Sequence, residues 1–350
     1  MDEKSEAAKE LRSVMEAVAQ AAVARDYARR PALLAKYGER GRARYLEDTR
    51  YHQSYLADAV NFGRPSIFKD YLSWVSAVLS ARRVASAELF ENLRCMREVL
   101  NETLSPGSLA IVLEVFDAGV AGATSVDRSE QALPADGLTA RYVDFLLRGQ
   151  RQAALELVQD AIRAGTGIRD IWLRVFQDSQ YEVGRLWQSN KISIAQEHYC
   201  TAATQMIMAQ LYSHIFSGPR IGRVLVTACA PGETHELGMR MVADLFEMEG
   251  WDTYHLGANL PAAALVAYVA QRQPDLLGLS ATMTFNLAGV AAMVRELRAN
   301  QDTRGVRIMV GGHAFNREPD LWRDIGADEH ACNGAEAVAA AAGLPASAEG

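Results

Sequence analysis

The chain has 350 residues, 49% of them hydrophobic and 23% charged, which is typical of folded proteins and long enough for two or three domains. Its net charge of -7 and pI near 5.6 argue against general nucleic-acid binding. A charged amino terminus and the lack of a long apolar run predict a cytoplasmic protein without a membrane anchor. Cys95, Cys200, Cys229 and Cys332 form no CxxC pair, which disfavours a disulfide scaffold or a zinc site.

The first two thirds of the chain have a helical pattern. Over residues 1–124, apolar residues recur at helical spacing, as at Leu89, Leu93 and Met96, and predict an all-α module. A polar stretch with proline and glycine at residues 125–137 predicts a linker. Helical periodicity returns over residues 138–218, with breaks near Gly149, Gly165 and Ser189. We therefore expect a four-helix bundle in this part of the chain.

The last part, residues 219–350, alternates between strand-like and helical runs. The alternation predicts an α/β fold with a doubly wound parallel sheet, Rossmann-like or flavodoxin-like. Ligands of such sheets bind at the carboxyl ends of the strands. The expected strands are Val224–Ala228, Thr253–Leu256, Leu276–Ser280 and Val306–Val310, and the expected helices are Glu236–Glu249, Ala262–Gln273 and Leu287–Ala299.

Three short motifs follow predicted strands and should meet at one edge of the sheet. The first, Glu233-Thr234-His235-Glu236-Leu237-Gly238, suits a histidine metal ligand oriented by a carboxylate, although the same residues can form an ordinary surface loop. The others, Ser280-Ala281-Thr282 and Gly311-Gly312, are small enough to leave a slot for a ligand tail, or they cap a helix and end a strand. No GxGxxG fingerprint or P-loop is present, which disfavours a dinucleotide or NTP site.

Residues 220 to about 343 resemble a cobalamin-binding domain, because all three motifs occur in that family's order: an acid-x-His-x-x-Gly loop, a Ser-x-Thr element and a Gly-Gly pair. The resemblance implies that His235 is the lower axial ligand of cobalt and displaces the cofactor's own base. It also implies that Glu233, in place of the usual Asp, tunes the protonation of His235 together with Ser280. The residues implied to line the cofactor and its tail are Gly238, Ser280, Thr282, Gly311, Gly312, Asn333 and Gly334.

The helical bundle narrows the resemblance within cobalamin proteins. Trp187 precedes Glu197-His198 with nine residues between, and Ser193 with Gln196 predicts a capping box that starts a helix there. On packing grounds alone, Trp187 is a core residue and the pair is a solvated helix start. The spacing is similar to the cap of light-sensing adenosylcobalamin repressors, the CarH-type photoreceptors. That resemblance implies that the three residues contact the adenosyl group. Gln188 departs from the family pattern, which has a histidine after the tryptophan.

The amino-terminal module departs from those repressors, because residues 1–124 lack a basic recognition helix and direct DNA binding is not expected. Its arrangement before the cap resembles the photocobilins, which implies a biliverdin beside adenosylcobalamin. Aromatic and basic residues in this module form either an amphipathic core or a pocket for a flat conjugated acid. The implied bilin residues are His52, Tyr55, Tyr71, Trp74, Arg82 and Arg83.

The resemblances together predict a photoreceptor without enzymatic activity. Cleavage of the cobalt-carbon bond by light would change the packing of the cap and the self-association of the chain, and so signal to a downstream effector. The alternative is a corrinoid shuttle protein of a methyltransferase system, whose upper face must stay open to partner enzymes. A cobalamin storage or delivery module without photochemistry is a further alternative.

Overall fold

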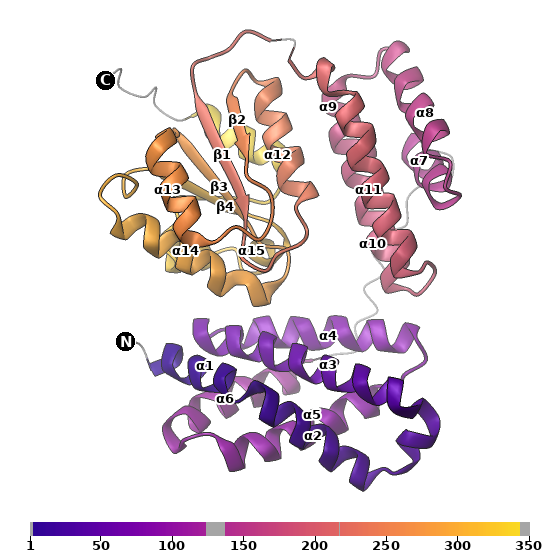
Figure 1. Ribbon diagram of the computed structural model, residues 1–350, viewed down its shortest axis with the longest axis vertical. Helices are drawn as coiled ribbons and strands as arrows, with labels where there is room; N and C mark the ends of the chain where they lie inside the picture. Colours follow the sequence, from indigo (N-terminus) through magenta and orange to yellow (C-terminus); the bar gives the residue numbers. More distant parts are fainter. Residues whose placement is uncertain (1–2, 124–136, 217, 344–350) are drawn as a thin grey trace. The chain divides into compact units, whose positions relative to one another are not determined.

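The computed structural model describes residues 3–123, 137–216 and 218–343, and the chain divides into two compact units, Met1–Arg128 and Ser129–Gly350 (Figure 1). The predicted linker at 125–137 falls outside the described residues, apart from Gly137. No helix in the described parts of the chain is long and apolar enough to cross a membrane.

The first unit is an all-α module, as predicted. Pro65 and Pro106 each occupy the first turn of a helix, where the missing N–H has no partner to lose. The longest helix bends at Gly38, whose φ of 64° interrupts the helical backbone. The helices are α1 (Glu3–Ser13), α2 (Met15–Arg29), α3 (Ala32–Phe62), α4 (Pro65–Ala81), α5 (Ser86–Thr103) and α6 (Pro106–Gly122).

The second unit begins with the expected helical bundle. Its four rods are α7 (Leu138–Leu147), α8 (Arg151–Arg163), a long rod made of three segments, and α11 (Ile194–Gln210), followed by the short turn η2 (Tyr212–His214). The long rod joins α9 (Ile168–Asp170), the π-helical η1 (Ile171–Gln177) and α10 (Asp178–Gln188). The π-helical stretch was not predicted, because hydrophobic spacing does not separate it from an α-helix.

The rest of the second unit is a parallel sheet covered by helices, which confirms the predicted fold. The sheet order is β2-β1-β3-β4-β5, and all four pairings are parallel. The fifth strand and the last helices were not predicted. The strands are β1 (Val224–Cys229), β2 (Asp252–His255), β3 (Leu276–Ser280), β4 (Arg307–Gly311) and β5 (Glu329–Ala331). The helices are α12 (Leu237–Met248), α13 (Ala262–Arg272), η3 (Thr284–Asn286), α14 (Leu287–Ala299), α15 (His313–Arg317), α16 (Leu321–Asp324) and α17 (Gly334–Ala342).

Helix α12 joins the bundle to the sheet. Leu237, Met241 and Leu245 recur every four residues on one of its faces and are buried in the core cluster of the bundle. Burial of each contributes about 1.5–3 kcal/mol relative to exposure. The indole Nε1 of Trp172, in the π-helical stretch, donates a 2.9 Å hydrogen bond to the buried Asp244 on α12. The bundle is therefore fixed to the helix that follows the Glu233–Gly238 loop.

Candidate functional site

The loop between β1 and α12 holds a buried carboxylate that is hydrogen-bonded at both oxygens. Glu233 is 1% exposed. Its Oε1 accepts from the backbone N–H groups of Thr234 and His235, at 3.0 and 3.1 Å, and lies 2.5 Å from His235 Nδ1. Its Oε2 accepts from the backbone N–H groups of Thr282 and Met283, at 2.8 and 3.1 Å. The acid thus ties the histidine loop to the end of β3.

These contacts determine the charge of Glu233 and the tautomer of His235. Burial alone raises the pKa of Glu233. The hydrogen bonds that its carboxylate accepts from the side chain and backbone of His235, and from the backbone of Met283, outweigh burial and hold the pKa at about 2. The hydrogen bond to Glu233 raises the pKa of His235, against the opposing effect of burial. Because the ionised carboxylate can only accept, Nδ1 of His235 donates to it. In neutral His235 the lone pair is therefore on Nε2, the atom that can bind a metal.

His235 is exposed enough to bind a ligand and is not a core residue. Its side chain is 56% exposed, although its orienting acid is buried. Among the described residues, no group of three or more His, Cys, Asp or Glu could hold a metal ion. A metal bound at His235 must therefore bring its other ligands with it, as a corrin ring does for cobalt.

The residues at the end of β3 contact the Glu233–His235 pair differently from the sequence prediction. The hydroxyl of Ser280 donates to Cys229 Sγ at 3.4 Å rather than to Glu233 or His235, so its predicted part in tuning the histidine is not seen. Thr282 acts through its backbone N–H. Asn286, which the sequence analysis missed, donates from Nδ2 to Glu233 Oε2 at 3.0 Å. Its position in the polar segment after a strand end was the available signal.

At the ends of β3 and β4, where the slot for the ligand tail is predicted, both glycines pack against main chain. A Cβ atom on Gly312, whose φ is 94°, would lie 2.5 Å from the carbonyl oxygen of Ala281, and one on Gly311 would lie 2.9 Å from that of Ala331. Neither glycine can be replaced without moving main chain. A Cβ on Gly238 would meet nothing within 4 Å, so space is open beside the start of α12. These glycines let neighbouring main-chain segments approach closely, and the slot itself stays a prediction.

Asn333 and Gly334, implied to line the cofactor and its tail, lie at the start of helix α17. Asn333 is the N-cap of this helix, and its side chain accepts from the backbone N–H of Glu336 at 2.9 Å. Gly334 is buried, and a Cβ there would come within 2.5 Å of Leu245 on α12. Both residues therefore have structural roles at this edge, and their contact with a ligand stays a prediction.

The cap residues lie where the sequence predicted, at the ends of α10 and α11. Ser193 and Gln196 form the expected capping box at the start of α11. Trp187 is partly buried against the core cluster of the bundle, and His198 Nδ1 contacts Glu197 Oε2. Glu197 also acts on the loop below, because its charge contributes to the raised pKa of His235. The cap pair and the histidine loop therefore belong to one electrostatic environment.

The aromatic residues predicted to hold a bilin pack mainly on one another. Tyr55 and Tyr71 stack at 3.6 Å between ring centroids, and His52 Nδ1 lies 2.6 Å from the hydroxyl of Tyr71. All three are at most 6% exposed. Trp74 on α4 lies at the edge of this cluster, and the predicted arginines, Arg82 and Arg83, directly follow that helix. This packing matches the amphipathic core, so the bilin pocket stays a prediction.

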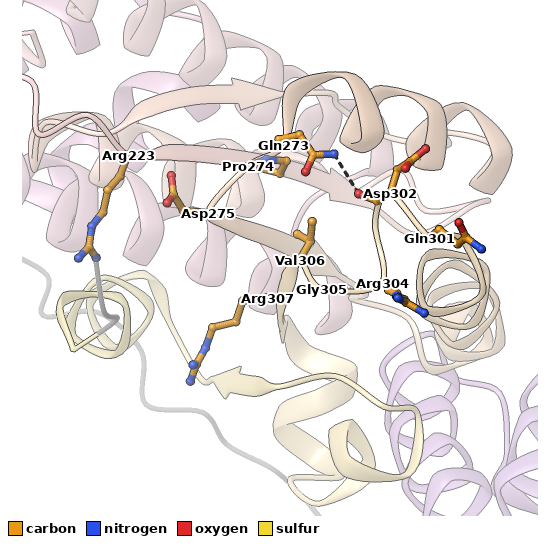
Figure 2. Close-up of a pocket in the computed structure, with 10 residues that line it drawn as sticks. All are labelled: Arg223, Gln273, Pro274, Asp275, Gln301, Asp302, Arg304, Gly305, Val306 and Arg307. Carbon is orange, nitrogen blue, oxygen red and sulfur yellow. Dashed lines mark hydrogen bonds between the residues drawn. The ribbon is translucent and has the colours of Figure 1, made fainter. Parts of the chain in front are cut away.

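A pocket of about 490 Å³ lies at the opposite, amino-terminal edge of the sheet (Figure 2). It is lined by the segments that precede β1, β3 and β4. Its arginines do not converge on one point in Figure 2, and Arg307 pairs with Glu329 at 2.9 Å. The histidine loop is at the other ends of the same strands, so this pocket is separate from the candidate site.

Comparison with known proteins agrees with this geometry. One family model, described as a B12 binding domain, matches residues 223–342, and a second of the same description matches residues 138–212. A monomethylamine corrinoid protein from Methanosarcina barkeri has a similar fold, with a TM-score of 0.53 and 23% identity over 59% of this chain and 98% of that one.

The curated relatives include two kinds of protein. The dimethylamine corrinoid protein 3 of Methanosarcina acetivorans is 27% identical over 59% of this chain and 96% of its own length, and that of Methanosarcina mazei is 30% identical over 33% and 68%. The HTH-type transcriptional repressor CarH of Myxococcus xanthus is 33% identical over 38% of this chain and 44% of its own length. The matched segments support the helical cap and the sheet domain as one unit.

Proposed function

From the premise that this chain belongs to the family of B12-binding corrinoid proteins, we propose that it binds cobalamin with His235 as the lower ligand of cobalt and with the cofactor's own base detached. The observation that carries this proposal is the Glu233–His235 unit: a buried, ionised acid that orients a half-exposed imidazole and leaves its Nε2 outward.

Other residues of the chain would hold the cofactor around this contact. The detached nucleotide tail would enter the backbone-walled slot beside Gly311 and Gly312, and the corrin ring would lie over the carboxyl edge of the sheet. Trp187 and Glu197, at the ends of the cap helices, would face the upper ligand. When bound, the corrinoid supplies a cobalt centre that carries an exchangeable alkyl ligand. The chain supplies the lower ligand and the cover.

For the role of this site, we propose a corrinoid carrier that serves separate methyltransferase enzymes and has no catalytic activity of its own. The dimethylamine corrinoid proteins support this role, because the similarity to one of them extends over 96% of its length. The carrier role requires that the cap let partner enzymes reach the upper face. The amino-terminal module precedes the segments matched by the family models. In the carrier role this module therefore has a separate task.

A second candidate is the light-sensing role, with adenosylcobalamin as the ligand. It is favoured by the position of Trp187, whose indole packs at the edge of the cap, and of the Glu197–His198 pair at the start of α11. The similarity to CarH also supports it. In this role the cap would close on the adenosyl group, and light would release it. Biliverdin in the amino-terminal module belongs to this candidate alone.

Electron paramagnetic resonance tests the proposed lower ligand. The purified protein is loaded with cobalamin and reduced to the cobalt(II) state, once unlabelled and once with all protein nitrogen replaced by nitrogen-15. A protein imidazole below cobalt changes the nitrogen splitting on labelling, whereas the cofactor's own base does not. We expect the change in the wild-type protein. An unchanged splitting would contradict the assignment of His235.

Illumination separates the two roles. Protein loaded in darkness with adenosylcobalamin, and in parallel with methylcobalamin and with biliverdin added, is examined by absorption spectroscopy and sedimentation before and after green light. The light-sensing role requires preferential binding of the adenosyl form and a change of sedimentation on illumination. The carrier role requires methylcobalamin binding and transfer of the methyl group to an added thiol by a partner methyltransferase. Photolysis alone, without a sedimentation change, supports neither.

A further inference from the structure

Helix α11 has an exposed apolar stripe on the side away from its buried face. The buried face consists of Cys200, Ala203, Thr204, Ile207 and Met208. The exposed stripe consists of Ala195, Tyr199, Ala202, Met206 and Ala209, and Tyr199 and Met206 are 36% and 47% exposed. A surface helix normally carries polar or charged residues on its outer side. An outer side made of apolar residues indicates that another element covers it.

The spacing of the stripe identifies that element as a helix. Its members are separated by four, three, four and three positions, which is the heptad spacing of a coiled-coil seam. Large and small residues alternate along it, with Tyr199 and Met206 between alanines. Alternation of this kind leaves a hole beside each large side chain, into which a large side chain of a facing helix fits.

The stripe is complementary to itself in the antiparallel direction. We propose that α11 pairs with α11 of a second copy of this chain, related by a two-fold axis at the level between Ala202 and Met206. In this register each Met206 lies opposite Ala202 of the second copy, and each Tyr199 lies opposite Ala209. In these contacts each large side chain lies opposite a small one, and Ala195 lies beyond the overlap of the two helices. A parallel pairing would instead place Tyr199 against Tyr199 and Met206 against Met206.

Charge and surface shape agree with this pairing. The five stripe residues are uncharged, and antiparallel helix dipoles attract. The guanidinium of Arg151 on α8 contacts Met206 Sδ at 3.4 Å, so it borders the seam and must turn aside when the two copies meet. Glu197, the acidic residue in the first turn of α11, lies outside the stripe. Gln205, on the same face of α11 as Glu197, contacts Glu236 of the sheet domain. A groove of about 310 Å³ borders the amino end of the stripe, where the carboxyl end of the second α11 would arrive. It is lined by Leu146, Leu147, Gly149, Ala195, Gln196 and Tyr199.

The size of the contact predicts a reversible dimer. Helix α11 has 17 residues. Its length is therefore about 25 Å. One helix pair of that length buries less than the roughly 1,600 Å² of a standard stable interface. We therefore expect association at micromolar concentrations of the full chain, without any requirement for bound cofactor.

Sedimentation velocity of the full chain under reducing conditions tests the proposal. The wild-type protein should form a concentration-dependent dimer. Met206→Glu and Ala202→Glu each place a charge in the seam and should weaken the dimer by at least about 10-fold, since burial of an unpaired charge is costly. Tyr181→Glu is the matched control, because Tyr181 is 64% exposed on α10 and lies outside the stripe. It should leave the dimer unchanged.

A disulfide experiment tests the antiparallel register. In a Cys332→Ser background, which removes the exposed cysteine, Ala202→Cys and Met206→Cys proteins are oxidised alone and mixed. The antiparallel register requires that the mixture cross-link faster than either protein alone. Faster cross-linking of the separate proteins would overturn the register, and a monomeric wild type at micromolar concentrations would overturn the proposal. In that case the melting temperature of the monomer shows what covers the stripe. If Met206→Glu lowers it, another part of the same chain packs on the stripe.

Discussion

The second unit contains two glutamate-histidine pairs, and they are built in opposite ways. In the loop pair, Glu233 is buried, both of its oxygens are hydrogen-bonded, and it fixes the orientation of His235. In the cap pair, Glu197 and His198 contact each other on the surface, and the imidazole is 73% exposed. The structure around the loop pair determines its geometry before any ligand arrives. The cap pair has weaker support, since Thr201 Oγ1 donates to Glu197 Oε1 at 3.4 Å while the imidazole is exposed, and we expect a ligand to order it.

The comparison makes its strongest prediction for the two histidines. His235→Ala removes the proposed cobalt ligand and should weaken cobalamin binding by more than the roughly 10–100-fold that loss of an outer partner costs. His198→Ala removes an exposed side chain and should change the affinity little. Titration of both apo variants with aquocobalamin, followed by absorption, measures the two dissociation constants. Equal losses would show that the pairs are not built differently.

The two acids should differ next. Glu233→Gln replaces an oxygen that accepts from His235 and backbone N–H groups by an amide that cannot satisfy all of these donors. We expect a loss of cobalamin affinity of about 10–100-fold. Glu197→Gln should cost less than about 5-fold, since exposed pairs contribute at most about 1 kcal/mol. Equilibrium dialysis with both variants gives the ratio, and a larger loss for Glu197→Gln would reverse the comparison.

Asn286 helps to hold the loop pair rigid, because it donates to Glu233. Asn286→Ala removes one donor from the buried carboxylate of Glu233 and should lower the free energy of unfolding of the apo protein by about 2 kcal/mol. Urea unfolding followed by circular dichroism measures this change. Asn300→Ala, at the C-cap of α14, is the control for an exposed asparagine hydrogen bond, that from the backbone N–H of Asp302, and should cost less. If both variants unfold alike, the acid does not depend on Asn286.

The last expected effect concerns pH and the joint between cap and sheet. Burial raises the pKa of Asp244 to about 6, although the hydrogen bond from Trp172 opposes this. Because this folded pKa lies above the unfolded value near 4, Asp244 contributes stability at low pH that is lost as pH rises from about 4 to 6. The loss between pH 4.5 and 7.5 should be roughly 2 kcal/mol, since a pKa difference of one corresponds to about 1.4 kcal/mol. Asp244→Asn should abolish it in urea unfolding at pH 4.5 and 7.5, and the exposed Asp160→Asn should not.

The sequence predicted the site well where local pattern and topology suffice. Parallel strands bring their carboxyl ends to one edge, so the loop at His235 and the glycines at Gly311 and Gly312 could be placed together from order alone. The capping box placed Glu197 and His198 with equal accuracy. The local capping motif and the topology of the parallel sheet are therefore sufficient for these two predictions.

Other features depend on distant contacts and left no local signal. Asn286 meets Glu233 from 53 positions away, and Ser280 donates to Cys229 rather than to the acid. Strand β5 has three residues and is too short for a recognisable alternation. The spacing of His52, Tyr55 and Tyr71 is the same for a filled core and for a pocket, and only the packing shows that their rings contact one another.

The glycine walls at the ends of β3 and β4 have an evolutionary consequence. A side chain on Gly311 or Gly312 would meet main-chain carbonyl oxygens, and glycine already has the smallest side chain. Point mutations at these two positions can therefore displace main chain but cannot create space beside it. A lineage that needed to accept a bulkier lower base would have to shift whole strands or insert residues. Adaptation to a different corrinoid is thus expected to appear as insertions and deletions between β3 and α15, and seldom as substitutions.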